Sequence, residues 1–293
     1  MPAAPSARAA SLGPIRAALA EDRVDLDRTT IALFPRPVRA TAHVIAQAAG
    51  TVSGVRVATA IARGAGLRAR ASRRDGDRVV AGTTVLTVRG DLRRILGVER
   101  TMLNFLMHLS GVATATARAV RAAGPLQVFA TRKTLPGLRD LEKSAVVHGG
   151  GHPHRRDLSD LVLIKNNHLA HIAVVDAVGK ARRSVGGRRP VQVEVRTAAD
   201  ARSAARAGAD ALLLDNQGPA QARRIVRSLE SAGLRRRVWV EVSGGVTPET
   251  VRRYRRSGAD AASLGALTHS AAALPFHLVV DRPRAARRPR HST

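Results

Sequence analysis

The pattern of hydrophobic and polar residues changes near residue 120 of this 293-residue chain. Between residues 38 and 90, β-branched runs alternate with Gly-Asp, Ala-Gly and Arg-Gly pairs, as in RRDGDRVVAGTTVLTVRG at 73–90. This alternation predicts short strands joined by turns. Leucine and isoleucine then recur at helical spacing over 91–108, which predicts one long helix.

After residue 120, the chain repeats an apolar run followed by a longer segment rich in Ala, Arg and Leu. Apolar strands that alternate with helices are typical of a parallel sheet covered on both faces. Six such units predict a β/α barrel, complete or incomplete. The six runs are LQVFATRK (126–133), DLVLIKNN (160–167), VQVEVRT (191–197), DALLLDN (210–216), RVWVEVSGG (237–245) and DAASLGAL (260–267).

Each of these runs carries residues capable of chemistry at or near its carboxyl end. The carboxyl ends of barrel strands all face one mouth, where active sites are built, so we expect these residues to share a site. In chain order they are Arg132 and Lys133, Lys165, Glu194, Asp215 and Asn216, Ser243 with Gly244 and Gly245, and Gly265.

The chain is strongly basic, with 49 Lys plus Arg against 22 Asp plus Glu, which raises nucleic-acid binding as an alternative function. However, the cations are spread over the whole length, and one Trp, one Tyr and four Phe are too few for a base-stacking platform. We therefore expect no specific nucleic-acid partner. We interpret the charge as compositional drift, because Arg and Ala are both abundant and Lys is nearly absent, and an anionic small substrate fits the charge equally well.

Cysteine is absent, which excludes disulfides, thiolate metal sites and cysteine nucleophiles. No apolar run reaches the roughly 18 residues that a membrane span needs. The opening MPAAPSARAASLGPIRAALAED lacks a compact apolar stretch after a basic start, so we interpret it as a ragged extension and not as a secretion signal. We expect a cytoplasmic protein without a membrane partner.

Only four of the cations are lysines, and two of them, Lys133 and Lys165, lie at predicted strand ends. An ammonium is a compact point charge, whereas a guanidinium is a rigid planar fork. These two lysines therefore indicate places where the fork does not fit. We interpret Lys143, on the helix after the first barrel strand, and Lys180, in a loop, as ordinary helix or surface residues.

Glycines after the fifth and sixth barrel strands, in VSGG and LGA, predict a phosphate site, because backbone N–H groups can approach an oxyanion there. Glu194 and Asp215, at neighbouring strand ends, could bind sugar hydroxyls or hold Mg²⁺ directly or through water.

The segment HGGGHPH raises the alternative of a zinc site, but the arginines that follow it repel a cation. The candidate zinc ligands are His148, His152, His154 and His168. A basic pocket for a carboxylated ligand explains a different set together, namely Arg132, His154, Arg155 and Lys165.

In order and spacing, the segments TRKTLPGLR, EKSAV, GGGHPHR, LVLIKNNH, VEV, LLLDN, EVSGG and LGALTHS closely resemble the quinolinate phosphoribosyltransferase family. ALAEDRVDLDRTT near the start and ERTMLNFLMHLSGVAT in the predicted helix resemble further motifs of that family. The resemblance covers residues from about 15 to 280.

The resemblance implies an enzyme that transfers a phosphoribosyl group from phosphoribosyl pyrophosphate to quinolinate with decarboxylation. Its products are nicotinate mononucleotide, pyrophosphate and CO₂, in NAD biosynthesis. The implied fold is an N-terminal α/β sandwich domain over 1–118, completed by 275–293, and an incomplete, open-faced α/β barrel with parallel strands over 119–274. The strand HLVVD then returns to the sandwich domain. Magnesium is the implied cofactor, and a homodimer or a higher oligomer built from dimers is the implied assembly.

The resemblance also implies residue roles. The quinolinate carboxylates would bind Arg132, His154, Arg155 and Lys165. Lys133, Glu194 and Asp215 would bind phosphoribosyl pyrophosphate and its magnesium. Glu194 and Asp215 would hold the magnesium directly, through water or through pyrophosphate. The 5′-phosphate would lie on Ser243, Gly244, Gly245, Gly265 and His269, and Arg100 would reach the mouth of a partner subunit. The implied catalytic residues are Lys133, Lys165, Glu194 and Asp215.

Three positions depart from the usual family pattern. Leu26 stands in place of a glycine, Pro153 in place of an Asn, and Asn166 in place of an Asp. Pro153 bears on the carboxylate pocket and therefore on the acceptor. A molybdenum-transport-associated subfamily with the same scaffold and a different acceptor is the alternative, although Lys165 and the following Asn-His agree with the biosynthetic enzymes.

Overall fold

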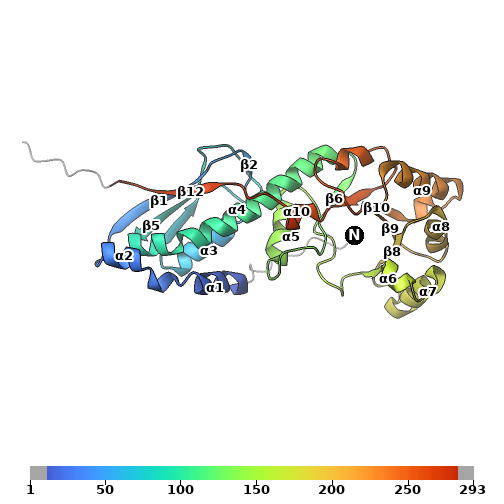
Figure 1. Ribbon diagram of the computed structural model, residues 1–293, viewed down its shortest axis with the longest axis horizontal. Coiled ribbons are helices and arrows are strands. Elements are labelled where there is room, and N and C mark those ends of the chain that lie inside the picture. The colour runs from blue at the N-terminus through green and yellow to red at the C-terminus, as the bar shows by residue number, and fades with distance from the viewer. Residues whose placement is uncertain (1–11, 283–293) are drawn as a thin grey trace, which may run out of the picture.

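An antiparallel four-stranded sheet organises the N-terminal part of the computed structural model, which describes residues 12–282 (Figure 1). Its order is β12-β1-β5-β3, with β1 at Arg39–Ala46, β3 at Arg68–Ala71, β5 at Thr84–Asp91 and β12 at Phe276–Val280. A separate pair joins β2 (Gly50–Thr51) to β4 (Arg78–Val79). The pairing of β12 with β1 confirms that the C-terminal strand returns to the first domain. Residues 1–11 and 283–293, which belong to the predicted N-terminal extension and domain completion, lie outside the described residues.

Helices α3 (Val55–Gly64) and α4 (Leu92–Ala123) pack against this sheet and against each other. Helix α3 corrects the prediction of strands and turns alone over 38–90. It starts after Gly54, which has a φ of 94°, and buries the apolar stripe Val55, Ala58, Ile61 and Ala62. Ahead of the sheet lie α1 (Leu12–Glu21), the 3₁₀ turn η1 (Val24–Leu26) and α2 (Arg28–Leu33).

Helix α4 runs well beyond the predicted end at residue 108, so that boundary was wrong. Glycine is an unfavourable residue inside a helix, but at Gly111 tertiary packing requires it. A Cβ on Gly111 would lie 2.3 Å from the carbonyl oxygen of Ala272, in the segment that leads back to β12. The helix passes through residue 118, so the domain division at that residue remains a prediction.

The C-terminal part contains a six-stranded parallel sheet, and each of the six predicted runs contributes one strand. Its order is β6-β11-β10-β9-β8-β7, so β6 and β7 form two edges and the barrel is open, which confirms the predicted fold class. The strands are β6 (Gln127–Phe129), β7 (Val162–Ile164), β8 (Val191–Val195), β9 (Ala211–Asp215), β10 (Trp239–Ser243) and β11 (Ala261–Ser263).

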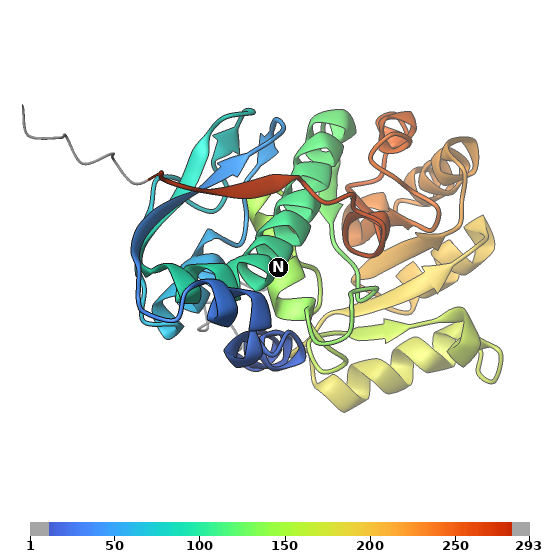
Figure 2. The ribbon, with the colours of Figure 1, turned by 60° about the vertical axis from the view of Figure 1, so that its left-hand side comes forward.

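Crossover helices cover the outer side of this sheet, with α7 (Val174–Val185), α8 (Ala198–Arg206) and α9 (Pro219–Ser231) side by side (Figures 1 and 2). The remaining helical segments are α5 (Arg139–His148), α6 (Asn166–Leu169), α10 (Ala266–His269), η2 (Arg235–Arg237) and η3 (Val251–Tyr254). Helix α5 packs against α4, at the junction of the two parts. In residues 12–282, no helix combines the length and the apolar character needed to cross a membrane.

Candidate active site

A cavity of about 360 Å³ lies at the carboxyl ends of the parallel strands. It brings together all the predicted site residues of the barrel, and we call it the mouth. These are Arg132, Lys133, His154, Arg155, Lys165, Glu194, Asp215, Ser243, Gly244, Gly245, Gly265 and His269. Arg100 is not among its lining residues. That side chain is exposed on α4 and lines a different pocket of about 420 Å³ with residues 22–24 and 26–28.

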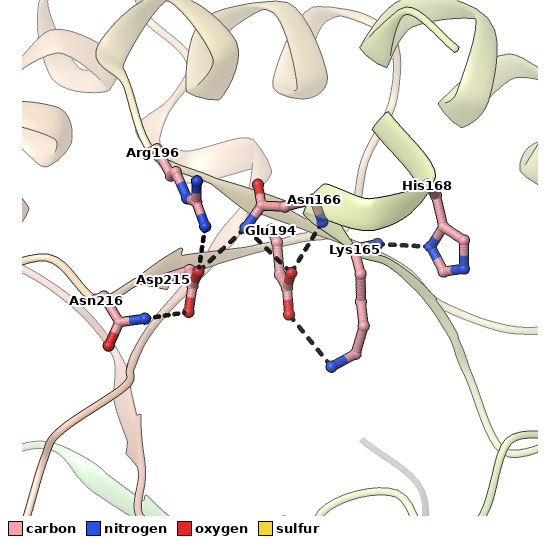
Figure 3. Close-up of polar contacts among 7 residues, drawn as sticks. All are labelled: Lys165, Asn166, His168, Glu194, Arg196, Asp215 and Asn216. Carbon is pink, nitrogen blue, oxygen red and sulfur yellow. Dashed lines mark hydrogen bonds and ion pairs between the residues drawn. The ribbon is translucent and has the colours of Figure 1, made fainter. Parts of the chain in front are cut away.

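One amide joins the two predicted magnesium-binding carboxylates (Figure 3). The Nδ2 of Asn166 donates to Glu194 Oε2 at 3.2 Å and to Asp215 Oδ2 at 3.0 Å. The backbone N–H of Asn166 also donates to Glu194 Oε2, at 3.0 Å. The Nζ of Lys165 lies 3.5 Å from the other carboxylate oxygen of Glu194, Oε1. Both carboxylates are thereby held at the floor of the mouth by donors from the end of β7.

Arginines also line the mouth. Arg155 is buried, and burial together with the neighbouring Arg132 lowers the pKa of its guanidinium. Within the part of the chain that the structure describes, the buried Nε of Arg132 has no hydrogen-bond partner. Two neighbouring guanidinium groups that repel each other form a site that is suited to an anion.

His154 is held beside these arginines in an unusual backbone conformation, with a φ of +54°. Its Nδ1 accepts from the backbone N–H of Arg155 at 2.7 Å, and its Nε2 lies 3.4 Å from the carboxylate of Glu241. A left-handed conformation in a residue other than glycine is uncommon and is often found at functional sites.

Glu241 lines the mouth, and the sequence analysis did not select it. It is buried in β10 and accepts from Gln192 Nε2 at 3.0 Å. Burial raises the pKa of the Glu241 carboxyl, but His154, Ser263 and Gln192 together outweigh this effect and hold the pKa below its usual value. The sequence does contain a signal for Glu241, because it is a charged residue inside an apolar run. It lies two residues before Ser243, so both side chains point to the same face of the strand, toward the cavity.

The glycine loops after β10 and β11 are tight. Gly244 has a φ of +86°, and a Cβ there would lie 2.2 Å from Asn216 Oδ1 and 2.9 Å from the Asn216 backbone nitrogen. A Cβ on Gly265 would lie 2.9 Å from His269 Nε2 and 3.1 Å from Lys133 Cδ. Both glycines therefore keep the backbone open toward the mouth, as the phosphate-site prediction requires.

Lys143 and Lys180 lie outside the mouth, and the structure corrects part of the prediction for each. Lys180 lies in α7 and not in a loop, although it is exposed. Lys143 lies on α5 as predicted, but it is buried, with 5% of its surface accessible. Burial and the neighbouring Arg139 lower the pKa of the Lys143 ammonium to about 8.

The candidate zinc ligands are used in separate contacts. His148 Nδ1 lies 2.8 Å from the Ser53 hydroxyl, and His152 stacks on Phe129. His168 Nδ1 accepts from the backbone N–H of Lys165 at 2.8 Å. Among residues 12–282, no three His, Asp or Glu side chains gather as a metal-binding set.

The carboxylate pair can nevertheless take part in holding magnesium. Mg²⁺ in proteins is commonly bound by one or two carboxylates, with the remaining positions filled by substrate phosphates and water. Glu194 and Asp215, joined by one amide at the floor of the mouth, match such an incomplete protein ligand set. They fit an ion that binds together with a pyrophosphate group.

Comparisons with known proteins agree with this architecture. Residues 27–110 and 112–279 match the N-terminal and C-terminal domain models of quinolinate phosphoribosyl transferase. A probable nicotinate-nucleotide pyrophosphorylase (carboxylating) of Methanothermobacter thermautotrophicus is 44% identical over 252 residues, covering 84% of this chain and 90% of the relative. A protein of the same name from Archaeoglobus fulgidus is 40% identical, covering 82% of this chain and 93% of the relative.

Solved structures agree as well. The crystal structure of NadC from Streptococcus pyogenes superposes with a TM-score of 0.83 at 38% identity, covering 92% of this chain and 96% of that chain. Since both domain models match in chain order and the relatives are covered over most of their length, the chain belongs to the quinolinate phosphoribosyltransferase family.

Proposed function

We propose that the protein transfers the phosphoribosyl group of phosphoribosyl pyrophosphate to quinolinate, with release of CO₂ and pyrophosphate, and forms nicotinate mononucleotide for NAD biosynthesis. The names of the relatives support this activity and do not favour the molybdenum-transport-associated alternative. The observation that carries the proposal is that one cavity combines a set of cations, including Arg132 and Arg155, with the carboxylate pair Glu194 and Asp215. An acceptor with two adjacent carboxylates and a donor with a ribose and a magnesium-bound pyrophosphate need these two environments.

The acceptor binds the cations of the mouth. The depressed pKa of Arg155 reflects burial and repulsion from Arg132, and the negative charge and hydrogen bonds of a dicarboxylate would offset both effects. Arg132 lines the same cavity and supplies further guanidinium donors. His154 lies between these arginines and the buried Glu241, and Lys165 completes the pocket from the end of β7.

The donor binds the remaining part of the mouth. The 5′-phosphate lies on Ser243, Gly244, Gly245, Gly265 and His269, where the glycines let backbone groups approach an anion. Lys133 borders Gly265 and neutralises phosphate charge. Glu194 and Asp215 accept from the ribose hydroxyls and take part in holding Mg²⁺, which supplies neutralisation of the leaving pyrophosphate.

Catalysis in this arrangement is mainly positioning and electrostatics. Positive charge develops on the ribose ring as the bond from C1 to pyrophosphate breaks, and the carboxylates of Glu194 and Asp215 stabilise that charge. The cations of the mouth hold the pyridine ring so that its nitrogen can attack C1. When CO₂ leaves, the electron pair of the broken bond stays on the ring carbon, where the same cations stabilise it until a proton from water takes the place of CO₂.

The active assembly is a homodimer, or a larger oligomer built from dimers, in the cytoplasm. Arg100 is exposed outside its own mouth and completes the mouth of a second copy. Apolar side chains that lie exposed on η1 and α2, close to α4, support an interface between copies at this place. They are Leu26, Ile31 and Leu33.

The test is a comparison of acceptors. Purified protein with phosphoribosyl pyrophosphate and Mg²⁺ is supplied with quinolinate, nicotinate or nicotinamide, and CO₂ and nicotinate mononucleotide are measured. We expect turnover of quinolinate only, with CO₂ and mononucleotide in equal amounts. Faster turnover of nicotinate would contradict the choice of acceptor, and no turnover of any acceptor would contradict the proposed activity.

A further inference from the structure

Helix α5 carries two adjacent charged residues that are both buried and that bind two different loops, each of which carries residues of the mouth. Glu142 has no accessible surface. Its Oε1 lies 2.8 Å from His108 Nε2 on α4, and its Oε2 accepts from the backbone N–H of Leu135 at 3.1 Å. Leu135 belongs to the loop after β6 that carries Arg132 and Lys133, so Glu142 connects this loop to α4.

Lys143 connects the second cationic loop. Its Nζ donates to the backbone carbonyl of Pro153, which immediately precedes His154 and Arg155. Residues adjacent on a helix point in directions about 100° apart, so one helix can reach both loops only if two neighbouring side chains divide the task. Residues 131–138, which follow β6, and residues 152–157, which follow α5, are therefore supported from the same turn of α5.

Burial of these charges is costly, which argues that the contacts have a purpose. A buried ion is stabilising only when partners satisfy it, and a hydrophobic side chain of similar size fills the same space without that cost. Lys143 is in a particularly unfavourable place, because Arg132, Arg139 and Arg155 all lie near enough to oppose its charge and Asp160 alone favours it. A single carbonyl acceptor suits the compact ammonium and not the guanidinium fork, which accounts for a lysine in an arginine-rich chain.

We infer that Glu142 and Lys143 are positioning residues that fix the two cation-bearing loops of the mouth in their binding geometry. This inference rests on the proposed function for its effect on substrates. Loop 131–138 carries a cation for each substrate, Arg132 for quinolinate and Lys133 for phosphoribosyl pyrophosphate. Loop 152–157 carries only acceptor-binding residues. Loss of the two supports therefore produces different kinetic signatures.

The kinetic test uses Lys143→Met and Glu142→Leu, with Lys180→Met on exposed α7 as the matched control. We expect Lys143→Met to raise the KM for quinolinate roughly tenfold or more and to leave the KM for phosphoribosyl pyrophosphate unchanged, since small misplacements near a site are costly. Glu142→Leu raises both KM values, whereas Glu142→Gln, which keeps an acceptor for the Leu135 N–H, stays within about threefold of wild type. Equal changes in both KM values for Lys143→Met would overturn the inference.

A second measurement is independent of any substrate. In Lys143→Met, amide hydrogen exchange accelerates in peptides covering 152–157 and remains unchanged over 131–138. Glu142→Leu gives the reverse pattern, and if that variant does not fold, Lys143→Met alone decides. Unchanged exchange in both segments would overturn the positioning role, whereas an inactive wild type with the expected exchange pattern would overturn only the proposed function.

Discussion

The side-chain amide of Asn166 donates to the carboxylate of Asp215 at 3.0 Å. Asn166 follows β7 and Asp215 ends β9, so this hydrogen bond spans β8, the strand between them that carries Glu194. The same nitrogen also reaches Glu194, so an uncharged bridge separates two negative charges. The usual Asp at this position of the family pattern could not donate to both. The substitution therefore lowers the negative charge at the floor of the mouth without losing the connection between its two carboxylates.

Asn166→Asp tests this relationship. A third carboxylate adds charge that attracts Mg²⁺, and repulsion among three carboxylates raises their pKa values. We expect severalfold tighter binding of Mg²⁺ alone in a calorimetric titration, and a pH–rate profile whose acid limb moves to higher pH. Asn167→Asp, at the exposed neighbouring position, is the control and should change neither measurement. If the two variants behave alike, the bridge has no electrostatic role.

Lys165 and Lys180 provide a matched pair for the lysine hypothesis. The Nζ of Lys165 lies 3.5 Å from Glu194 in the mouth, whereas Lys180 is exposed on α7. Lys165→Arg conserves charge but replaces a compact ammonium by a planar fork, and we expect a loss of kcat/KM of roughly a hundredfold. Lys180→Arg should be nearly silent. Equal tolerance at both positions would mean that the position of Lys165 has no special requirement for ammonium.

Gly244 and Gly245 both have a positive φ, but only Gly244 is crowded. A side chain at Gly244 meets the backbone and side chain of Asn216, whereas nothing lies within 4 Å of a Cβ at Gly245. In urea unfolding we expect Gly245→Ala to cost about 1–2 kcal/mol from backbone strain alone. Gly244→Ala should cost more, by about 1–3 kcal/mol, because it adds overpacking. A smaller loss for Gly244→Ala would show that Asn216 can move away.

The barrel could be predicted because its strands are short apolar runs with chemistry at their carboxyl ends, and β8 and β9 follow that pattern. Helix α3 was missed because Gly54 and the alanines resemble turn residues, although their apolar stripe has helical spacing. The predicted end of α4 was wrong because the helix continues through Gly111, where close packing against Ala272, far away in the sequence, leaves no room for a side chain. Long-range contacts of this kind leave no local pattern.

The residues of the site also differ in whether the local sequence identifies them. Lys165 and Glu194 could be selected from their place at strand ends. The environment of Lys143 could not be predicted, because its hydrogen-bond partner Pro153 and the nearby Arg132 and Arg155 come from two other segments. Glu241 stood in an apolar run and could have been found, but its partner Gln192 lies two strands away in the sheet.

Lys143 also makes stability depend on pH. The pKa of its ammonium is about 8 in the folded protein and 10.5 in the unfolded chain, so the unfolded state binds more protons between these values. Stability therefore rises with pH across this window, and the cost of the buried charge is fully present below about pH 8. Relative to Lys143→Met, wild type should gain on the order of 3 kcal/mol in free energy of unfolding from pH 8 to 10.5. A difference that is constant with pH would contradict the assigned burial.

Arg100 lies on α4 outside the mouth of its own chain, and the proposed dimer gives it a role in a second mouth. If so, Arg100→Ala and Lys165→Ala are each inactive alone, since every mouth lacks one residue. In a heterodimer of the two variants, one mouth carries both defects and the other carries neither. We therefore expect about half of the wild-type activity for a heterodimer, and about a quarter for a random mixture after subunit exchange, by simple counting of intact mouths.

The control for this experiment is a mixture of Lys133→Ala and Lys165→Ala. Both residues line the mouth of their own chain, so each mouth of that heterodimer keeps one defect and activity should not return. Native mass spectrometry verifies that heterodimers have formed in both mixtures. If verified heterodimers of Arg100→Ala and Lys165→Ala stay inactive, Arg100 serves its own chain or the fold, and the complementary mouth has to be abandoned.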